Sequence, residues 1–242
     1  MRSRILALAA AMAAIASPAH AMHISEGILP AGWAALWYAV ALPFVIWGLR
    51  DLRKQSAADL RFKPLVGLVG AAVFVFSCMP IPVPTAGTCS HPVGTGLAAI
   101  LIGAPLAVVV TSIALLLQAL FLAHGGLTTL GANMVAMGVV GGFTGYMVFK
   151  TARRLGASWW IAAFLAGLLS DWATYTMTSF ELASALRGQV ALSDMFLAIL
   201  VAFTPTQLPL GILEGVVTAG ALGFIRSRRP ELMTIFAKGG AQ

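Results

Sequence analysis

The chain has 242 residues, of which 60% are hydrophobic and only 10% are charged. A soluble domain carries about 25% charged residues, so this composition excludes an ordinary soluble protein and predicts a membrane protein. The formal net charge is +7, but no Lys or Arg occurs between Lys63 and Lys150. The positive charges are therefore kept out of the apolar segments, which is typical of membrane topology and not of nucleic-acid binding. Two cysteines, Cys78 and Cys89, are too few for a disulfide scaffold or a CxxC-type metal site.

Residues 1–21 have the features of a secretory signal peptide. Met1–Arg4 contains two arginines, Ile5–Ile15 is apolar, and the sequence Ala-His-Ala at 19–21 fits the small-x-small cleavage rule. The apolar stretch is too short to cross a hydrocarbon core of about 30 Å, which argues against an uncleaved first helix. We therefore expect residues 22–242 to form a single membrane domain after cleavage.

Hydropathy predicts an all-α fold with about seven transmembrane helices, one of them short. The third segment would span only about 18 Å at about 1.5 Å per residue, so we expect it to form half a crossing. Pro205 and Pro209 predict a kink in the seventh segment. The segments run roughly over Pro30–Leu49, Pro64–Met79, Pro92–Gly103, Pro105–Ala123, Leu127–Phe149, Ser158–Phe180 and Asp194–Ile225.

The distribution of basic residues predicts the orientation of a multi-pass protein in the bacterial inner membrane. A cleaved signal peptide places the N-terminus outside, and seven crossings then place the C-terminus in the cytoplasm. The expected cytoplasmic segments, which are the 50–63 loop, the 150–154 loop and the C-terminal tail, contain five, three and four basic residues. The outer loops contain only Arg187. This count agrees with the positive-inside rule.

The same topology places the three histidines of the mature chain, His23, His91 and His124, on the outer side. After cleavage, the α-amine of Met22 can chelate one ion together with the backbone nitrogen and the imidazole Nδ1 of His23. A deprotonated amide nitrogen favours square-planar nickel, copper or low-spin cobalt over tetrahedral zinc. His91, at the start of the short third segment, is the candidate fourth nitrogen. Spacing alone leaves an ordinary solvated histidine as the alternative for His23.

Several longer stretches, taken together, narrow the interpretation. They are MHISEGILP at 22–30, GTCSHP at 87–92, LLQAL at 116–120, LAHGGLTTLGAN at 122–133 and TQLPLGILEG at 206–215. In this order they resemble the CbiM/NikM family, the substrate-binding membrane subunits of energy-coupling-factor cobalt and nickel transporters. The resemblance covers the entire mature chain.

The resemblance implies a ligand set and a transport function. Met22 and His23 would bind the metal through their nitrogens, with His91 as the second imidazole. The chain would then capture Co²⁺ for ATP-driven uptake that serves cobalamin biosynthesis, with the ion as cargo and no cofactor. The expected partners are a transmembrane coupling subunit, ATPase subunits, a possible small accessory membrane subunit and the lipid bilayer, without nucleic acid. The GTCSHP sequence and the Glu26-Gly27 pair favour cobalt, and nickel uptake is the alternative.

Other polar residues have more than one interpretation. His124 suits a structural hydrogen bond better than a metal bond, although a ligand role stays open. Cys89 fits a soft ligand, a disulfide to Cys78 or a small packed side chain. Ligating imidazoles are usually oriented by outer hydrogen-bond partners, and the candidates for this role are His124, Ser25, Glu26, Thr88, Ser90 and Asn133.

Two acidic residues, Asp171 and Glu214, fall inside apolar segments, where ionisable groups are costly and often functional. Each fits either a transport pathway or a hydrogen-bonded tie between helices. Ala31, Ala35 and Ala39 are spaced to permit close helix approach, either to the coupling subunit or within the chain.

No motif supports catalysis by this chain. HExxH, GxSxG and the Walker A pattern GxxxxGK[ST] do not occur, so we expect a transporter subunit that depends on partners for ATP hydrolysis. The enzyme-class alternative is an intramembrane metalloenzyme, which needs an open metal position and a general base. A channel or standalone carrier is the other alternative, and it predicts uptake without ATPase partners.

Overall fold

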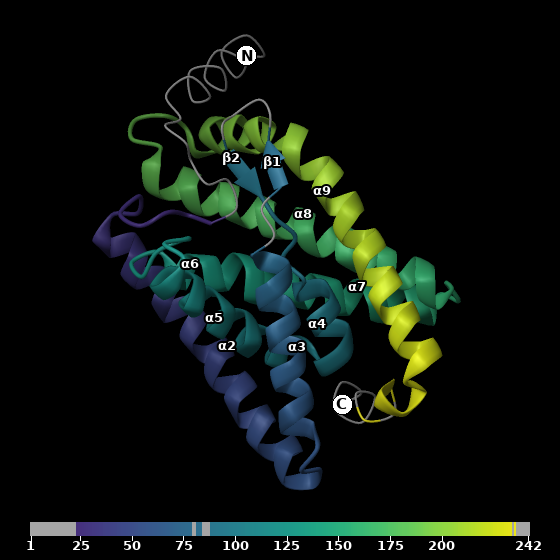
Figure 1. Cartoon of the computed structure of the whole chain (residues 1–242). Coiled ribbons are helices and arrows are strands. Elements are labelled where there is room, and N and C mark those ends of the chain that lie inside the picture. Colours follow the sequence, from purple (N-terminus) through teal and green to yellow (C-terminus); the bar gives the residue numbers. More distant parts are fainter. Residues whose placement is uncertain (1–22, 79–80, 84–87, 234, 236–242) are drawn as a thin grey trace.

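The computed structural model shown in Figure 1 describes residues 23–78, 81–83, 88–233 and 235, with only the backbone for 81–83 and 88–90. The predicted signal peptide, residues 1–21, and the predicted ligand Met22 lie outside the described residues. The described chain is helical apart from one antiparallel hairpin. Its elements are α2 (Ala31–Ala58), α3 (Phe62–Ser77), β1 (Ile81–Val83), β2 (Thr88–Ser90), α4 (Thr95–Ile102), α5 (Ala104–Phe121), α6 (Leu130–Asn133), the π-helix η1 (Met134–Gly141), α7 (Gly142–Arg154), α8 (Trp159–Leu186) and α9 (Leu192–Arg228).

Each of the seven predicted apolar segments contains a helix, and α6, η1 and α7 form one continuous helix in the fifth. Four helical segments of the described chain are long and apolar enough to cross a membrane: Ala31–Ala58, Ala104–Phe121, Leu130–Arg154 and Leu192–Arg228. The shorter Phe62–Ser77 is also apolar. These helices support an integral membrane protein. The number of crossings, the signal peptide and the orientation stay predictions.

The hairpin is the one departure from the predicted all-α fold. Strands β1 and β2 pair Ile81 with Ser90, Pro82 with Cys89 and Val83 with Thr88. Strands of three residues are too short to show an alternating hydropathy pattern, so the sequence did not reveal them. The hairpin reverses the chain after α3 and leads directly into the segment that carries His91.

Helix α4 is the predicted short segment, and it lies inside the protein. All of its residues except Ile100 are buried. It contacts α3, α5, α7, α8 and α9, so its ends are surrounded by protein. Gly94 precedes the helix with a φ of 73°, a left-handed conformation that glycine adopts without strain. Non-helical backbone is tolerated at membrane depth only where protein covers it, and this enclosure satisfies that requirement.

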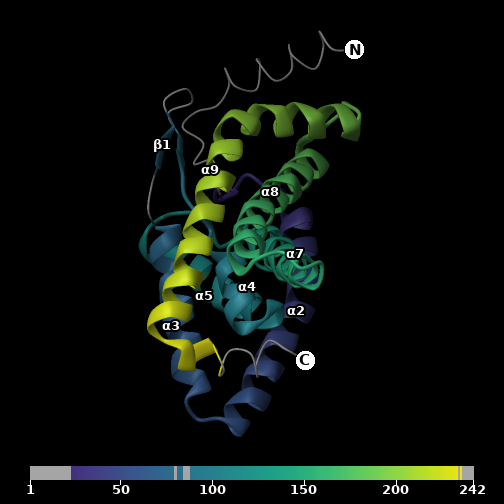
Figure 2. The same ribbon diagram turned by 90° about the vertical axis from the view of Figure 1, so that its right-hand side faces the viewer.

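Helix α9 bends strongly in Figure 2, as its prolines predict. Pro205 and Pro209 lie inside the helix, where each removes a backbone hydrogen bond. Beyond the bend, α9 packs closely along α8. A Cβ atom added to Gly167 of α8 would lie 2.6 Å from Thr218 Oγ1 and 2.8 Å from the Glu214 carbonyl oxygen. This close approach lets side chains of α9 reach the interior of the molecule.

We predict that Gly131→Ala destabilises the protein, because α6 packs directly on the backbone of α2. An added Cβ atom would lie 2.5 Å from the Tyr38 nitrogen and 2.8 Å from its Cα atom. Such overpacking costs about 1–3 kcal/mol. The matched control is Gly220→Ala in α9, where no atom lies within 4 Å of the added Cβ. Thermal unfolding in detergent should show a lower Tm for Gly131→Ala alone, and equal Tm values would contradict the packing.

Candidate metal centre

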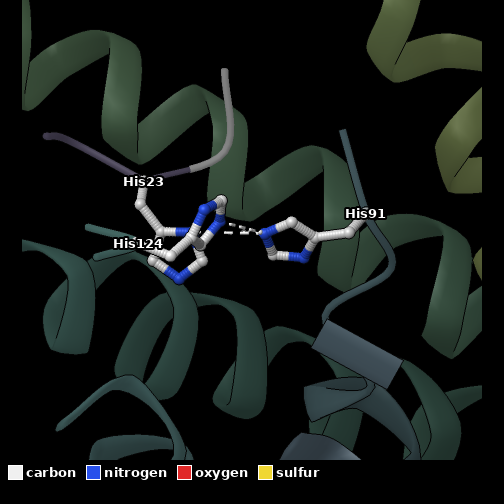
Figure 3. Close-up of side chains that lie close together, drawn as sticks. All are labelled: His23, His91 and His124. Carbon is white, nitrogen blue, oxygen red and sulfur yellow. Dashed lines mark hydrogen bonds between the residues drawn. The ribbon is translucent and has the colours of Figure 1, made fainter. Parts of the chain in front are cut away.

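Three imidazoles from distant parts of the sequence meet in the interior, as Figure 3 shows. His91 Nε2 lies 3.2 Å from His23 Nδ1 and 3.0 Å from His124 Nε2. His23 and His91 are 4% and 2% exposed, and His124 is half-buried. They are the only group of three or more His, Cys, Asp or Glu residues in the described chain with metal-binding geometry. The structure thus brings together both predicted imidazole ligands and His124.

The two short spacings around His91 Nε2 fit neighbouring ligands of a single metal ion. With metal–nitrogen bonds of about 2.0 Å, two adjacent ligand nitrogens lie about 2.8 Å apart in a square plane and about 3.3 Å apart in a tetrahedron. The observed 3.0 and 3.2 Å fall in this interval. Both pairs with His91 therefore have the spacing of neighbouring ligands, and the three nitrogens together lie within 4.8 Å of one another.

The tautomer of His91 follows from its own loop. Its Nδ1 lies 3.2 Å from the carbonyl oxygen of Pro92. A carbonyl oxygen only accepts, so the proton is on Nδ1 and the Nε2 lone pair points at the other two imidazoles. Burial and the neighbouring His124 lower the pKa of His91 to about 3, which keeps the ring neutral at physiological pH. A neutral imidazole is the form that binds a metal.

The His91 loop is held by a carboxylate from α9. Glu214 accepts hydrogen bonds from the backbone nitrogens of Val93 at 2.8 Å and Gly94 at 2.9 Å. Glu214 is only 1% exposed, so these bonds are shielded from water. Of the two interpretations of Glu214 from the sequence, the structure shows the tie between segments. This tie lies two residues from His91 and across 120 residues of sequence.

The main chain beside His23 is fixed by Asn133 of α6 and by Thr129, the residue that precedes α6. Asn133 Oδ1 accepts from the Ile24 nitrogen at 2.9 Å, and Asn133 Nδ2 donates to the Ile24 carbonyl oxygen at 3.2 Å. Thr129 Oγ1 donates to the same carbonyl at 2.6 Å. Asn133, predicted as an outer partner of the imidazoles, therefore acts on the backbone next to His23.

Glu26 attaches the N-terminal segment to the loop after α5. Its carboxylate accepts a hydrogen bond from the Thr128 nitrogen at 3.1 Å. The Thr128 side chain, and to a smaller extent the backbone nitrogens of Thr128 and Leu127, lower the pKa of Glu26 by hydrogen bonding. The Glu26 nitrogen donates to the Gly125 carbonyl at 3.2 Å. Glu26 is exposed and is not a member of the imidazole cluster, and its expected role as an outer partner of the imidazoles stays a prediction.

His124 lies in the turn that ends α5. Its nitrogen donates to the Gln118 carbonyl at 3.2 Å, and its neighbours Ala123 and Gly125 have φ values of 49° and 77°. A Cβ atom on Gly125 would lie 3.4 Å from the Cβ and Cδ2 atoms of His23. The small glycine thus allows the His23 side chain to pass close to the turn, beside the His124 ring. The sequence favoured a structural role for His124, whereas its Nε2 is as near to His91 as the Nδ1 of His23 is.

Gln118 is a site residue for which the sequence gave no role. Its Nε2 donates to Ser77 Oγ at 2.7 Å, while its Oε1 is buried without a partner among the described residues. His23 Nε2 is also buried without a hydrogen-bond partner among the described residues. Burial and the other two histidines lower the pKa of His23, and the nearby Gln118 side chain, which can accept a hydrogen bond from the protonated ring, partly offsets this shift. The Gln118 side chain therefore lies beside the His23 imidazole, and a glutamine inside an apolar segment was the available sequence signal.

The remaining predicted residues are only partly described. Ser25 is half-buried, and its carbonyl oxygen accepts from the Ile28 nitrogen in the turn before α2. The side chains of Thr88, Cys89 and Ser90 lie outside the described part, so their expected roles, and a disulfide to Cys78, stay predictions. Cys78 Sγ is 3.6 Å from Gln118 Nε2.

Two buried carboxyl groups of α8 have no hydrogen-bond partner among the described residues. They belong to Asp171 and Glu181, and both residues are 0% exposed. A Cβ atom on Gly211 would lie 3.1 Å from Asp171 Oδ2, which places this carboxyl against α9 one turn from Glu214. Neither residue is a member of the imidazole cluster.

Comparisons with known proteins identify the family of this chain. The family model for the cobalt uptake substrate-specific transmembrane region, CbiM, matches residues 23–232. The cobalt transport protein CbiM of Geobacter sulfurreducens is 63% identical over 219 residues, which are 90% of this chain and 63% of that protein. The chain thus matches less than two thirds of the length of that relative. The CbiM of Sorangium cellulosum is 61% identical over 212 residues, which are 88% of this chain and 94% of that protein.

A solved structure shows the same fold. The crystal structure of a truncated transition metal transporter superposes with a TM-score of 0.73 at 25% identity, covering 85% of this chain and 99% of the other. Family model, close relatives and fold agree, and the chain therefore belongs to the CbiM family of cobalt uptake substrate-specific transmembrane proteins.

Proposed function

We propose that this chain is the substrate-capture subunit of an ATP-driven Co²⁺ uptake transporter that supplies cobalamin biosynthesis. The observation that carries the proposal is the buried meeting of His23, His91 and His124 next to the start of the predicted mature chain. Several close relatives are named cobalt transport proteins, which favours cobalt as the cargo. The Glu26-Gly27 pair and the GTCSHP sequence favour cobalt over nickel in the same way, and nickel uptake is the alternative.

The proposed ligands are the α-amine of Met22, the backbone nitrogen and Nδ1 of His23, and Nε2 of His91. A chelate that includes the backbone nitrogen of His23 requires Nδ1, since Nε2 is too far from the main chain to close the ring. Nδ1 is also the His23 atom that faces His91 Nε2. In the metal-free protein, His124 Nε2–H can donate to the His91 lone pair, and the arriving ion would replace that hydrogen bond. Binding would release the protons of the amine and the amide.

The delivery step would depend on other subunits. The chain contains no Walker A motif, so we assign ATP hydrolysis to partner ATPase subunits, coupled through a transmembrane subunit and assisted by a small accessory membrane subunit. Ala31, Ala35 and Ala39 of α2 are exposed, so they do not serve packing within the described chain and suit a helix of the coupling subunit. With the ligands on the outer face of the inner membrane, delivery to the cytoplasm requires a large reorientation of the subunit.

We predict that one alanine inserted between Ala21 and Met22 abolishes high-affinity Co²⁺ binding, as His23→Ala does. The insertion moves the primary amine out of chelating position, so the loss should exceed the roughly 10–100-fold effect of residues that only support a ligand. The measurement is Co²⁺ titration of purified protein whose new N-terminus is verified by sequencing. An alanine inserted after Gly188, in the exposed α8–α9 connection, is the control and should bind normally. Normal binding by the N-terminal insertion would disprove the terminal chelate.

We predict that His91→Gln changes the number of imidazoles bound to Co²⁺, whereas His124→Gln changes only the affinity for Co²⁺. His91→Gln removes a proposed ligand, so the number of imidazoles seen by X-ray absorption of the Co²⁺-loaded protein should fall by one. His124→Gln should lower the affinity by roughly 10–100-fold and leave that number unchanged, because it removes a supporting contact. A loss of one imidazole in His124→Gln would instead make His124 a ligand.

We predict that Glu214→Gln weakens Co²⁺ binding by about tenfold or more without changing the ligands. The amide has a single acceptor oxygen, so one of the buried Val93 and Gly94 nitrogens loses its partner, at about 1–3 kcal/mol, and the His91 loop shifts. The exposed Glu231→Gln in the segment after α9 is the control. Co²⁺ titration and X-ray absorption on both variants check the outcome. Equal affinity in the two variants would show that the hydrogen bonds of Glu214 to Val93 and Gly94 do not position His91.

A further inference from the structure

A second cluster of functional side chains lies far from the imidazoles, where α7, α8 and α9 meet. Leu130–Arg154 is one continuous helix that carries Asn133 near its start and Arg153 near its end. Twenty residues of helix extend about 30 Å, which equals the thickness of the hydrocarbon core. If the imidazoles lie at one surface of the membrane, the Arg153 region lies at the other.

Two arginines from different helices stack on one indole ring in this region. The guanidinium carbons of Arg153 and Arg226 lie 4.6 Å and 4.3 Å from the centroid of the Trp159 ring. Arg153 also donates to the carbonyl oxygen of Ala157, which fixes its orientation. Stacking uses the faces of the guanidinium groups and leaves N–H groups at their edges for an anion.

The cluster contains no acidic side chain to balance these charges. Residues 142–161 and 215–230 contain neither Asp nor Glu. In the described chain the ion pairs are Arg61–Asp59 and Arg229–Glu231, so Arg153 and Arg226 have no carboxylate partner there. The helix dipoles and the positive-inside rule explain basic residues at helix ends. They do not explain why two like charges converge on one ring without a counterion.

Large exposed apolar side chains surround the cluster. Trp160, Ile161 and Phe224 are 54%, 48% and 65% exposed and lie within two residues of Trp159 or Arg226. Large exposed apolar side chains beside arginines are typical of the boundary between lipid tails and head groups. Arginine also binds phosphate oxygens in a bidentate manner.

We propose that Arg153 and Arg226, held on Trp159, bind the phosphate of an anionic phospholipid such as phosphatidylglycerol. The lipid tails lie against the exposed apolar side chains, and the head group neutralises the two guanidinium groups. Lys150, Arg154 and Arg228 add positive charge nearby and favour an anionic over a zwitterionic lipid. The bound lipid would join the ends of α7 and α9 at the membrane surface.

The test compares the wild type with the double variant Arg153→Gln/Arg226→Gln and with Arg61→Gln, an exposed arginine paired to Asp59. Each full-length protein is placed in nanodiscs of phosphatidylcholine with or without phosphatidylglycerol, extracted, and analysed by native mass spectrometry. The wild type and Arg61→Gln should retain phosphatidylglycerol preferentially, and the double variant should lose this preference at least fivefold. Phosphatidylglycerol should raise the Tm of the first two proteins only.

Further variants separate the proposal from simpler explanations. Arg153→Lys/Arg226→Lys keeps the charge but not the bidentate geometry, so it should retain an intermediate amount of lipid. Millimolar inorganic phosphate should not displace the lipid, because it lacks the tails. Unchanged lipid retention in the glutamine double variant would overturn the proposal. So would retained lipid together with lost association with partner subunits, which would make the cluster a protein contact.

Discussion

The buried main chain of Ile24 is the constraint on which the candidate metal centre depends. Its nitrogen and carbonyl oxygen are 2.9 and 3.2 Å from the amide group of Asn133, and Thr129 donates to the same carbonyl. An extended segment cannot satisfy its own backbone groups, and an apolar interior supplies no water to do so. The side-chain amide of Asn133 makes the two hydrogen bonds that a neighbouring β-strand would otherwise make with Ile24. These bonds fix the backbone of Ile24, and the adjacent His23 is buried next to it.

The other two imidazoles are positioned by the same kind of hydrogen bond. In each case, a polar group of a helix accepts from a backbone nitrogen of a neighbouring loop. Glu214 of α9 binds the backbone beyond His91, and the Gln118 carbonyl at the end of α5 binds the nitrogen of His124. Each contact is buried or partly buried, and its loss would leave an unsatisfied polar group. The site is thus assembled from segments far apart in the sequence, and its geometry depends on how α5, α6 and α9 pack. A displacement of α9 would be transmitted to His91 through the Glu214 carboxylate.

The electrostatics of the candidate site suit the proposed capture and release of a cation. Burial lowers the pKa of His23 and His91, so the rings are neutral and offer lone pairs rather than charge. No carboxylate belongs to the cluster in the described part of the chain, and Glu26 is occupied by Thr128. Affinity would then depend on the geometry of several nitrogens at once. A modest movement of one loop can weaken such a site more than it would weaken a site held by full negative charges.

The sequence by itself determined the class of protein, the positions of the apolar segments and the bend of α9, and it predicted His23 and His91 as metal ligands. These follow from local properties, namely hydropathy, proline placement and short motifs, which require no knowledge of distant contacts. Only the tertiary structure decided that His124 points into the cluster, that Glu214 ties α9 to the His91 loop, that Gln118 faces His23, and that Arg153 and Arg226 share Trp159. Each of these contacts joins residues from different segments, and their meeting depends on helix packing. The hydropathy pattern of one segment does not indicate which residues of another segment will contact it.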